Sequence, residues 1–321
     1  MADAAERLHD LLETAERALA GAPNVREGFQ GVRAIIGPSK FPEGEDLAQA
    51  GMDALRRGQV PSPAQIAALQ SVIKALRPSL LSERGLLDTL PAYQRYAPGI
   101  VDEWNAFRAK ARPLLYSVGR IDRMDGSSRD ALATGFVVAA GVLATNTHVL
   151  DALSAGERRL EKGQAVVLFG QEFGVAPDRP AVAITGVLAV HPSLDMCLLE
   201  IEDAAVSSWE IYSGVLGKGA KIAAIGYPQD DPRSPVFRDV IFQNRYGVKR
   251  GAPGEIRGTG PSAVYHDCST LGGNSGSPLV DLQTGRVVGI HRDGPLFLFR
   301  NEAVNGASLS AFVATSVGRT G

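Results

Sequence analysis

After residue 112 the chain consists of short apolar segments separated by turn residues. The segments include GFVVAAGVLATN, QAVVLFG, VAITGVLAV, MCLLEIE, KIAAIGYP, SAVYHD and RVVGIH. Strands at this density, without helices between them, favour an antiparallel barrel or sandwich, because a parallel sheet would alternate its strands with helical crossovers. The sequence therefore predicts an all-β region over residues 113–321.

The first 112 residues carry helical patterns instead. In PSPAQIAALQSVIKAL, Ser62 is placed to cap a helix, Pro63 takes the first helical position and Gln65 lies three residues after the cap. Apolar residues then recur at helical spacing, at Ile66, Leu69, Ile73 and Leu76. The opening MADAAERLHDLLETAERALAG has the same spacing at Leu8, Leu11, Leu12, Ala15 and Leu19. The stretch GPSKFPEGED is typical of a loop.

A further helix is expected in PGIVDEWNAFRAKARPLL, where Ile100, Trp104 and Phe107 fall on one side. Pro113 is expected to end this helix, because proline lacks the amide that a helix interior requires. We therefore predict a small α-helical domain over residues 1–112, followed by the β region.

Charge and hydropathy exclude several classes of function. The chain has 33 basic and 35 acidic residues and no long run of one sign, so we expect no nucleic-acid partner and no membrane partner. No apolar stretch approaches the roughly 20 residues that cross a bilayer. The N-terminus lacks the basic segment of a signal peptide, which indicates a cytoplasmic location. Cys197 and Cys268 are expected to be buried thiols, because a secreted disulfide protein usually carries more cysteines.

The stretch GGNSGSP is either a flexible polar loop or a turn that holds Ser275 in a reactive position. Glycines in such a turn allow positive φ angles and close backbone approach. The turn would then aim the amides of Gly273 and Ser275 at one point near the serine hydroxyl, as in an oxyanion hole. A phosphate-binding loop would be followed by a helix, whereas a strand is expected from Pro278.

A reactive serine needs a base, and His148 is the best candidate among the five histidines. In GVLATNTHVLDAL an apolar strand leads into a short polar turn and then into a possible helical turn, which would place the imidazole at the edge of a barrel. Taken alone, the motif fits a surface histidine better than a catalytic base. His9 lies outside the β region, and His191 and His266 fit structural positions at strand ends.

Asp195 is the candidate partner for that base, since it directly precedes an apolar run in HPSLDMCLLEIE. A partly desolvated carboxylate can accept the Nδ1–H of a histidine and fix its tautomer. The alternative is an aspartate that only starts a strand. Asp151 lies too close to His148 in sequence to face its ring. The order His148, Asp195, Ser275, with spacings of 47 and 80 residues, is a strong signal within one β region.

Together these segments resemble the chymotrypsin-fold serine proteases, most closely the bacterial glutamyl endopeptidase and trypsin-like peptidase branch. The resemblance rests on ATGFVVAAGVLATNTHVLDA, HPSLDMCLLEIE, IAAIGYPQD and DCSTLGGNSGSPLVDLQTGRVVGIH, and it covers roughly residues 114–315. It implies an all-β double barrel of two six-stranded antiparallel barrels, at about residues 113–205 and 206–321. The active site would lie between them.

The resemblance also implies the role of each residue. Ser275 would attack the scissile carbonyl, His148 would take and return its proton, and Asp195 would orient His148. The amides of Gly273 and Ser275 would hold the oxyanion. Asn274 departs from the vertebrate digestive pattern, where an aspartate receives a new N-terminus after zymogen cleavage, so that route of activation is not expected.

Substrate preference is implied by three further positions. In glutamyl endopeptidases, a histidine after the serine and a hydroxyl residue before it hold an acidic P1 side chain, the one that precedes the scissile bond. His291 and Thr270 occupy those positions here, and Ser269 falls at the base of the P1 pocket. The alternative is that His291 only packs at a strand end. Arg292 and Asp293 depart from the usual residues.

The sequence thus predicts a serine endopeptidase that acts on a protein or peptide substrate and needs neither a cofactor nor a metal. Residues 1–112 could be a propeptide, a packing extension or a regulatory adaptor with its own protein partner, as in a bacterial intracellular effector protease. Two alternatives are a binding protein that has lost the chemistry and a serine esterase of another fold. The esterase is disfavoured because no strand-turn-helix G-x-S-x-G motif is present.

Overall fold

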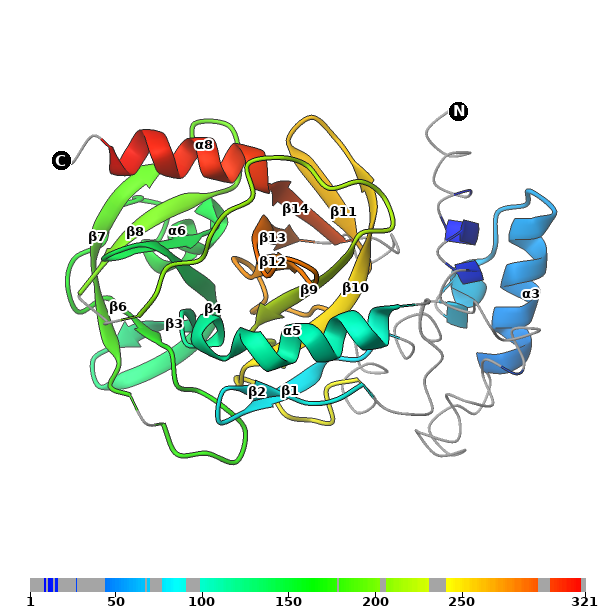
Figure 1. Cartoon of the computed structure of the whole chain (residues 1–321), viewed down its shortest axis with the longest axis horizontal. Helices are drawn as coiled ribbons and strands as arrows, with labels where there is room; N and C mark the ends of the chain where they lie inside the picture. The colour runs from blue at the N-terminus through cyan, green and yellow to red at the C-terminus, as the bar shows by residue number, and fades with distance from the viewer. Residues whose placement is uncertain are drawn as a thin grey trace.

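The computed structural model describes most of the chain (Figure 1). The described residues are 9, 11–13, 15–16, 27, 44–66, 68–69, 77–90, 99–177, 179–202, 206–230, 241–293 and 301–318. Two β-barrels hold most of the described residues after position 116, and the N-terminal helix α3 (Gly44–Arg56) lies beyond the second barrel in Figure 1.

The first barrel is built from consecutive short strands. They are β3 (Val118–Asp125), β4 (Ser128–Ala139), β5 (Val142–Thr145), β6 (Ala165–Leu168), β7 (Val182–Val190) and β8 (Cys197–Ile201). The barrel closes in the order β3-β4-β5-β8-β7-β6, with antiparallel neighbours throughout. Alternate side chains fill its interior, among them Ile121, Leu143 and Leu199.

The second barrel closes in the same way. Its strands are β9 (Lys221–Gly226), β10 (Arg250–Thr259), β11 (Ala263–His266), β12 (Pro278–Asp281), β13 (Val287–Asp293) and β14 (Asn301–Asn305). Pairing of β10 with β11 joins the two ends of the row β11-β14-β13-β12-β9-β10 into a ring. The predicted double barrel of six-stranded antiparallel sheets is confirmed.

Strand β10 also pairs with a hairpin from the N-terminal region. The hairpin consists of β1 (Leu80–Glu83) and β2 (Leu86–Leu87), and Leu80 and Leu81 pair with Gly251 and Arg250. The far end of β10 pairs with β11, so a single edge of this strand serves both the barrel and the hairpin. Part of the region expected to be helical is therefore β-structure joined to the second barrel.

Helix α5 (Ile100–Leu115) packs across the second barrel beside this hairpin (Figure 1). The predicted apolar side of the helix is buried, and the Trp104 indole N–H donates to Asp88 O at 3.0 Å. The prediction that Pro113 ends this helix is wrong, because the helix includes Pro113 and continues to Leu115. The helix therefore crosses the boundary that the sequence placed at residue 112.

The capping box at Ser62 is confirmed by both of its hydrogen bonds. The Ser62 amide donates to Gln65 Oε1 at 2.7 Å, and the Gln65 amide donates to Ser62 Oγ at 3.3 Å. Leu69 is buried as expected, whereas Ile73 and Leu76 lie outside the described residues. In the first expected helix, Leu11 and Ala15 are buried, and Leu8 and Leu19 lie outside the described residues.

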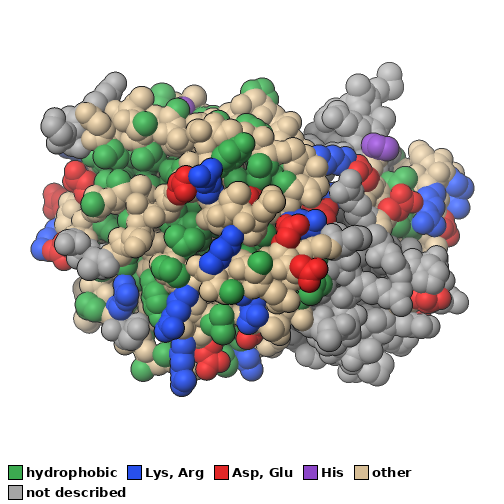
Figure 2. Space-filling model, viewed as in Figure 1, with side chains coloured by type: hydrophobic (Ala, Val, Ile, Leu, Met, Phe, Trp, Pro, Cys, Tyr) green, Lys and Arg blue, Asp and Glu red, His purple; other side chains and the backbone are tan. Residues whose placement is uncertain are grey.

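The surface of the described part mixes both signs of charge. In Figure 2, side chains of lysine and arginine and of aspartate and glutamate both appear on the face that is drawn. Among the described residues, no helix is long and apolar enough to span a bilayer. Cys197 and Cys268 are buried free thiols, as predicted.

The packing of α5 gives a test of how firmly the N-terminal region belongs to the barrel. Trp104→Ala is expected to lower the free energy of unfolding by about 3–5 kcal/mol, because it empties a fully buried site and frees Asp88 O. Val101→Ala is the control on the same helix, since Val101 is 43% exposed and should change it by less than about 0.5 kcal/mol. Denaturant unfolding measures both, and equal small losses would contradict this packing.

Candidate active site

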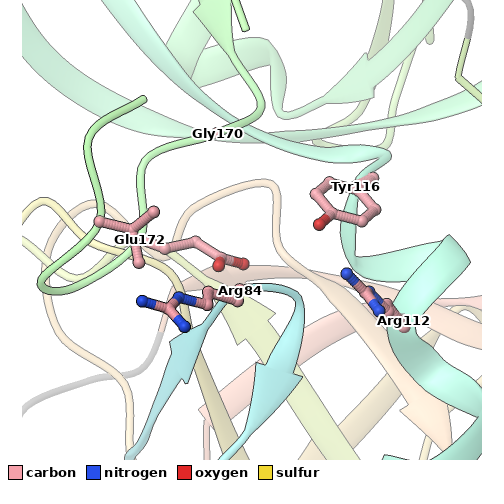
Figure 3. A pocket seen from close by; sticks show the side chains of 6 residues that line it. Arg84, Arg112, Tyr116, Gly170 and Glu172 are labelled. Atoms are coloured by element: carbon pink, nitrogen blue, oxygen red, sulfur yellow. The ribbon is translucent and has the colours of Figure 1, made fainter. Parts of the chain in front are cut away.

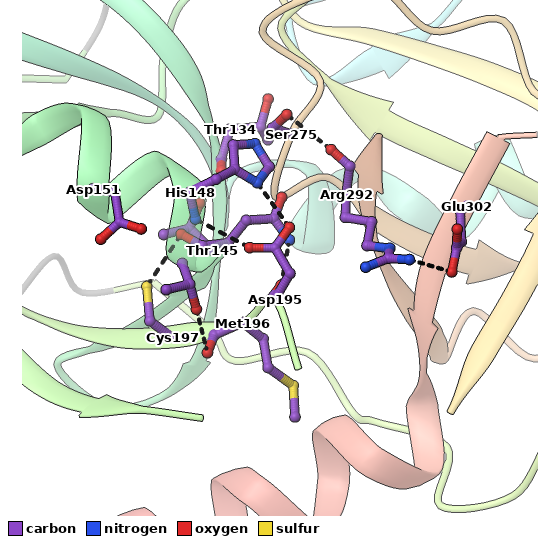
Figure 4. A network of polar contacts seen from close by, with 12 residues as sticks. Thr134, Thr145, His148, Asp151, Asp195, Met196, Cys197, Ser275, Arg292 and Glu302 are labelled. Carbon is purple, nitrogen blue, oxygen red and sulfur yellow. Dashed lines mark hydrogen bonds and ion pairs between the residues drawn. The ribbon is translucent and has the colours of Figure 1, made fainter. Parts of the chain in front are cut away.

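The structure brings His148 and Asp195 into direct contact (Figure 4). Strand β5 ends at Thr145, and the short helix α6 (Thr147–Leu153) then presents His148 at its start. Asp195 holds the histidine twice: Oδ1 accepts the His148 backbone amide at 3.0 Å, and Oδ2 lies 2.7 Å from Nδ1. Because an ionised carboxylate only accepts, Nδ1 carries a proton, and in the neutral tautomer of the ring the lone pair lies on Nε2.

The turn before Asp195 is organised by His191. The amides of Ser193 and Leu194 both donate to His191 Nδ1, at 3.2 and 2.9 Å. On the other side, Asn146 Nδ2 donates to the carbonyl oxygen of Asp195 at 2.8 Å. The strand-end position predicted for His191 is thus structural, and it shapes the turn that carries the carboxylate.

The Asp195 carboxylate is held ionised. Burial alone would raise its pKa, but the hydrogen bond and charge of His148 outweigh that effect and set the pKa below the usual range. The Arg292 guanidinium acts in the same direction more weakly. Asp151, the competing carboxylate, forms an ion pair with Arg158 instead.

The serine turn uses two glycines with left-handed backbone. Gly273 has φ +86° and Gly276 has φ +84°. A β-carbon would lie 2.4 Å from Tyr227 O at Gly273 and 2.1 Å from Thr134 O at Gly276, so neither position has room for a side chain. The turn is therefore a tightly packed structure rather than a flexible loop.

The backbone N–H groups of Gly273 and Ser275 have fixed directions, because the carbonyl group in the same peptide unit accepts a hydrogen bond in each case. Gly272 O accepts the Gln229 amide at 2.6 Å, and Asn274 O accepts the Ser277 amide at 2.9 Å. Since C=O and N–H point in opposite directions across a trans peptide, these bonds fix the directions of the Gly273 and Ser275 amides. Within the described part of the chain, neither amide donates a hydrogen bond, so both remain available.

Thr134, which the sequence did not single out, joins the serine turn to the first barrel. Its hydroxyl donates to Gly273 O at 2.7 Å and accepts the Tyr227 amide at 3.0 Å. Its backbone amide donates to Ser275 O at 2.9 Å. A threonine in an alternating strand carries no local signal for such a role, because the partners come from the other barrel.

The Ser275 hydroxyl donates to Arg292 O at 3.0 Å, and the Arg292 side chain turns away to pair with Glu302 (Figure 4). This is the one hydrogen bond of the hydroxyl among the residues with described positions. Rotation about the Cα–Cβ bond would redirect it, and such looseness is common before substrate binds.

His291 and His266 form a buried pair. Nε2 of His266 lies 3.1 Å from Nδ1 of His291, and both side chains are almost fully enclosed. Burial lowers the pKa of His266 to about 3. Burial, followed by the charges of His266 and His148, lowers the pKa of His291 well below its usual value. Both rings are therefore neutral at neutral pH.

Ser269 and Thr270 differ in their surroundings. The buried Ser269 hydroxyl donates to the carbonyl oxygen of Arg77 at 2.6 Å, so it is engaged with the N-terminal region rather than free at a pocket base. Thr270 is half-buried, and its hydroxyl makes no hydrogen bond to a described residue. Thr270 lies five residues before Ser275 in the sequence, and its contacts in the structure do not identify a ligand.

A separate cavity of about 220 Å³ lies where the N-terminal hairpin meets the first barrel (Figure 3). It is lined by Arg84, Arg112, Tyr116, Gly170, Glu172 and Val175. None of the predicted site residues lines it. Among the described residues, no cluster of histidine, cysteine, aspartate and glutamate side chains could hold a metal ion.

The bridge between the barrels can be tested at Thr134. Thr134→Val keeps the shape but leaves Gly273 O and the Tyr227 amide without a partner, so the free energy of unfolding should fall by about 2–4 kcal/mol. Thr315→Val is the matched control, because Thr315 is exposed on the C-terminal helix α8 (Gly306–Val317) and bonds only within it. Thermal or denaturant unfolding that shows no difference between the two variants would contradict the bridge.

Known proteins resemble this chain in sequence and in structure. Residues 133–290 match the model of the trypsin-like peptidase domain. A probable serine protease of Lysobacter enzymogenes is 28% identical over 280 residues, which cover 73% of this chain and 71% of that protein. A solved serine endoprotease from Yersinia pestis is 18% identical, with a TM-score of 0.49 over 67% of this chain and 66% of its own. A solved Glu endopeptidase is 19% identical, with a TM-score of 0.48 over 63% and 90%.

The barrels and the sequence matches agree on one class of protein. Each barrel is closed and six-stranded, and the trypsin-like domain spans strands of both. The relative that aligns over most of the chain is a probable serine protease. The chain is therefore a serine endopeptidase with the chymotrypsin fold.

Proposed function

We propose that this endopeptidase works through a triad of His148, Asp195 and Ser275. The observation that carries the proposal is the pair of contacts between the Asp195 carboxylate and His148. One oxygen accepts the His148 amide and the other binds Nδ1, so Nε2 is the nitrogen that can act as the base. The turn that holds Ser275 supplies two amides, of Gly273 and Ser275, that donate no hydrogen bond to a described residue. A binding protein that had lost its chemistry would have no need to keep both arrangements.

The proposed reaction starts when the Ser275 hydroxyl leaves Arg292 O and donates to His148 Nε2. Its oxygen attacks the scissile carbonyl while the proton moves to Nε2, and the ionised Asp195 stabilises the imidazolium. The amides of Gly273 and Ser275 receive the negative charge that develops on the carbonyl oxygen. His148 then protonates the leaving amine, which gives an acyl-enzyme, and water activated by the same histidine releases the acid.

We further propose that the enzyme prefers an acidic P1 side chain, as the resemblance to glutamyl endopeptidases implies. The tautomers of the buried histidine pair support this preference. His266 Nδ1 is buried without a partner in the described structure, and a bare lone pair there costs less than an unpaired N–H. His266 therefore donates from Nε2 to His291 Nδ1, and His291 presents its own Nε2–H to a ligand.

The Thr270 hydroxyl is the second proposed donor for an acidic P1 side chain, since it makes no hydrogen bond to a described residue. Ser269 is a weaker candidate for direct contact, because its hydroxyl is already donated to Arg77 O. Arg292 contributes little net charge, because its guanidinium is paired with Glu302. The P1 site is thus polar and has no free cation among these residues.

Regulation through residues 1–112, a protein partner for that region, an effector role and a cytoplasmic location remain proposals from the sequence. The division at residue 112 is also a proposal. Its support is the helical character of α3 and of the capped helix at Ser62. The hairpin and α5, by contrast, pack on the second barrel.

The triad is tested by covalent labelling with a fluorophosphonate probe and by peptide hydrolysis. The wild type should label, and Ser275→Ala should not. Asp195→Asn should lower kcat by about 10³–10⁴-fold, because the neutral amide favours the wrong tautomer of His148. Asp151→Asn is the control, since Asp151 pairs with Arg158, and it should leave kcat unchanged. Labelling that survives Ser275→Ala would refute the assignment.

The P1 preference is tested with peptides that differ only by Glu or Gln at P1. His291→Ala should reduce the preference for Glu by about 10–100-fold in kcat/KM, the range expected for a hydrogen bond to a charged group. Because the pKa of His291 is lowered, the ring is neutral at pH 7 and takes up a proton only as the pH falls. Because the ring stays neutral over this range, the Glu/Gln ratio of the wild type should be flat from pH 8 to pH 5.5, and His291→Ala should lower it at every pH. A wild-type preference for basic or bulky apolar P1 residues would contradict the proposal.

A further inference from the structure

A short segment of the N-terminal region, residues 77–79, lies against the chain that leads into the serine turn. The Arg77 guanidinium donates to Asp267 Oδ2 from Nε at 3.0 Å and from Nη2 at 2.8 Å. The Arg77 carbonyl accepts the Ser269 hydroxyl at 2.6 Å. One residue from outside the barrel thus binds two alternate residues of the 267–269 segment.

This contact is buried. The Arg77 and Asp267 side chains are only 3% and 1% exposed. The second carboxylate oxygen of Asp267 accepts the Glu255 amide of β10 at 2.6 Å. At Gly254 a β-carbon would lie 2.6 Å from Asp267 Oδ1, so the 267–268 chain rests directly on the β10 backbone. Asp267 is therefore clamped between β10 and Arg77.

The segment is itself fixed by the barrel. Arg250 of β10, which is buried, donates to the Ser79 carbonyl oxygen. Leu80 and Leu81 then continue as strand β1 on β10. Residues 77–81 are thus attached to the barrel through side chains and backbone, so Arg77 is held in place independently of its bond to Asp267.

The Arg77 contacts lie beside the proposed P1 residues along the chain. Asp267 directly follows His266, which bonds to His291, and Ser269 directly precedes Thr270. Removing the guanidinium would leave a buried carboxylate without its charge partner, which is costly enough to displace the segment that carries it. The neighbouring donors at His291 and Thr270 would then move relative to a P1 side chain.

The triad does not share these contacts. His148 and Asp195 belong to the first barrel, and Ser275 is positioned by Thr134, by the hydrogen bonds of its own turn and by the Gly276 amide, which donates to His291 O at 2.8 Å. A change at Arg77 should therefore affect recognition of the P1 side chain more than the reactivity of the serine.

We propose that Arg77 is a positioning residue for P1 recognition, which holds the 266–270 segment through its guanidinium on Asp267 and its carbonyl on Ser269. This inference rests on the proposed triad and P1 site. It makes residues 77–81 an integral part of the specificity site, which a cleaved propeptide could not be.

The test compares Arg77→Met and Arg77→Lys with Ser82→Ala in the full chain. Ser82 lies on the hairpin that begins three residues after Arg77 and is also buried, but its hydroxyl bonds to Glu172, so it controls for general loosening of the hairpin. In Arg77→Met, KM for the Glu-P1 peptide should rise about 10-fold or more and the Glu/Gln preference should collapse. The rate of fluorophosphonate labelling should stay within about 3-fold of the wild type. Arg77→Lys should recover part of the preference, and Ser82→Ala should keep it.

Each other outcome has a defined meaning. An unchanged P1 profile in folded Arg77→Met, or an equal loss in Ser82→Ala, overturns the role of Arg77. A wild type that does not label at Ser275 instead overturns the proposed function. If Arg77→Met fails to fold, Arg77→Met combined with Asp267→Leu removes both charges and should restore folding. That double variant should still lack the Glu preference, and a wild-type profile in it would also overturn the proposal.

Discussion

The candidate site depends on a backbone contact between the two barrels. The serine turn comes from the second barrel, yet its carbonyl groups at Gly273 and Ser275 bond to Thr134 of the first. Gly276 has no side chain because Thr134 O occupies that space. His148 and Asp195 are presented by the same barrel as Thr134. The contact at Thr134 therefore fixes Ser275, His148 and Asp195 in one frame, although they are far apart in sequence.

A second constraint joins the N-terminal region to this frame through strand β10. Its glycines at 251 and 254 leave room for Leu87 and Trp104 on one side and for the Asp267 segment on the other. A strand that contacts so many neighbours cannot carry large side chains at those positions. The same strand supplies the buried Arg250 that holds Ser79. The hairpin and α5 are thus part of the barrel's packing.

How far the sequence predicted this structure depended on whether a signal was local. The apolar runs gave β-strands, the Ser62 box formed as expected, and the polar turn at His148 became the start of a helix. Strand β10 was missed because RGAPGEIRGT looks like a loop. Its glycines at 251 and 254 are explained by close contacts with residues that are distant in the sequence. Pro113 was expected to stop α5, but the helix runs two residues past it and ends at Leu115.

Long-range contacts explain the remaining differences. Nothing near Ser269 indicates that its hydroxyl would bond to Arg77, 192 residues away. Thr134 gave no signal for the same reason. His266 fitted a structural strand end, and only the fold shows that its ring bonds to His291. The site residues were proposed from the chemistry that their side chains carry, whereas the residues that contact them are visible only in the three-dimensional structure.

The charged groups of the second barrel explain why the contacts of Arg77 with the 267–269 segment matter for the proposed P1 site. The buried charges of Arg77 and Asp267 cancel each other, Arg292 is paired with Glu302, and the two histidines are neutral. The proposed P1 site has no free cation among its described residues, so a preference for an acidic side chain would have to come from short hydrogen bonds. Hydrogen bonds weaken steeply when their angle or length is wrong. Such a site therefore needs its donors to be held rigidly, and the Arg77–Asp267 pair holds the segment on which one of them lies.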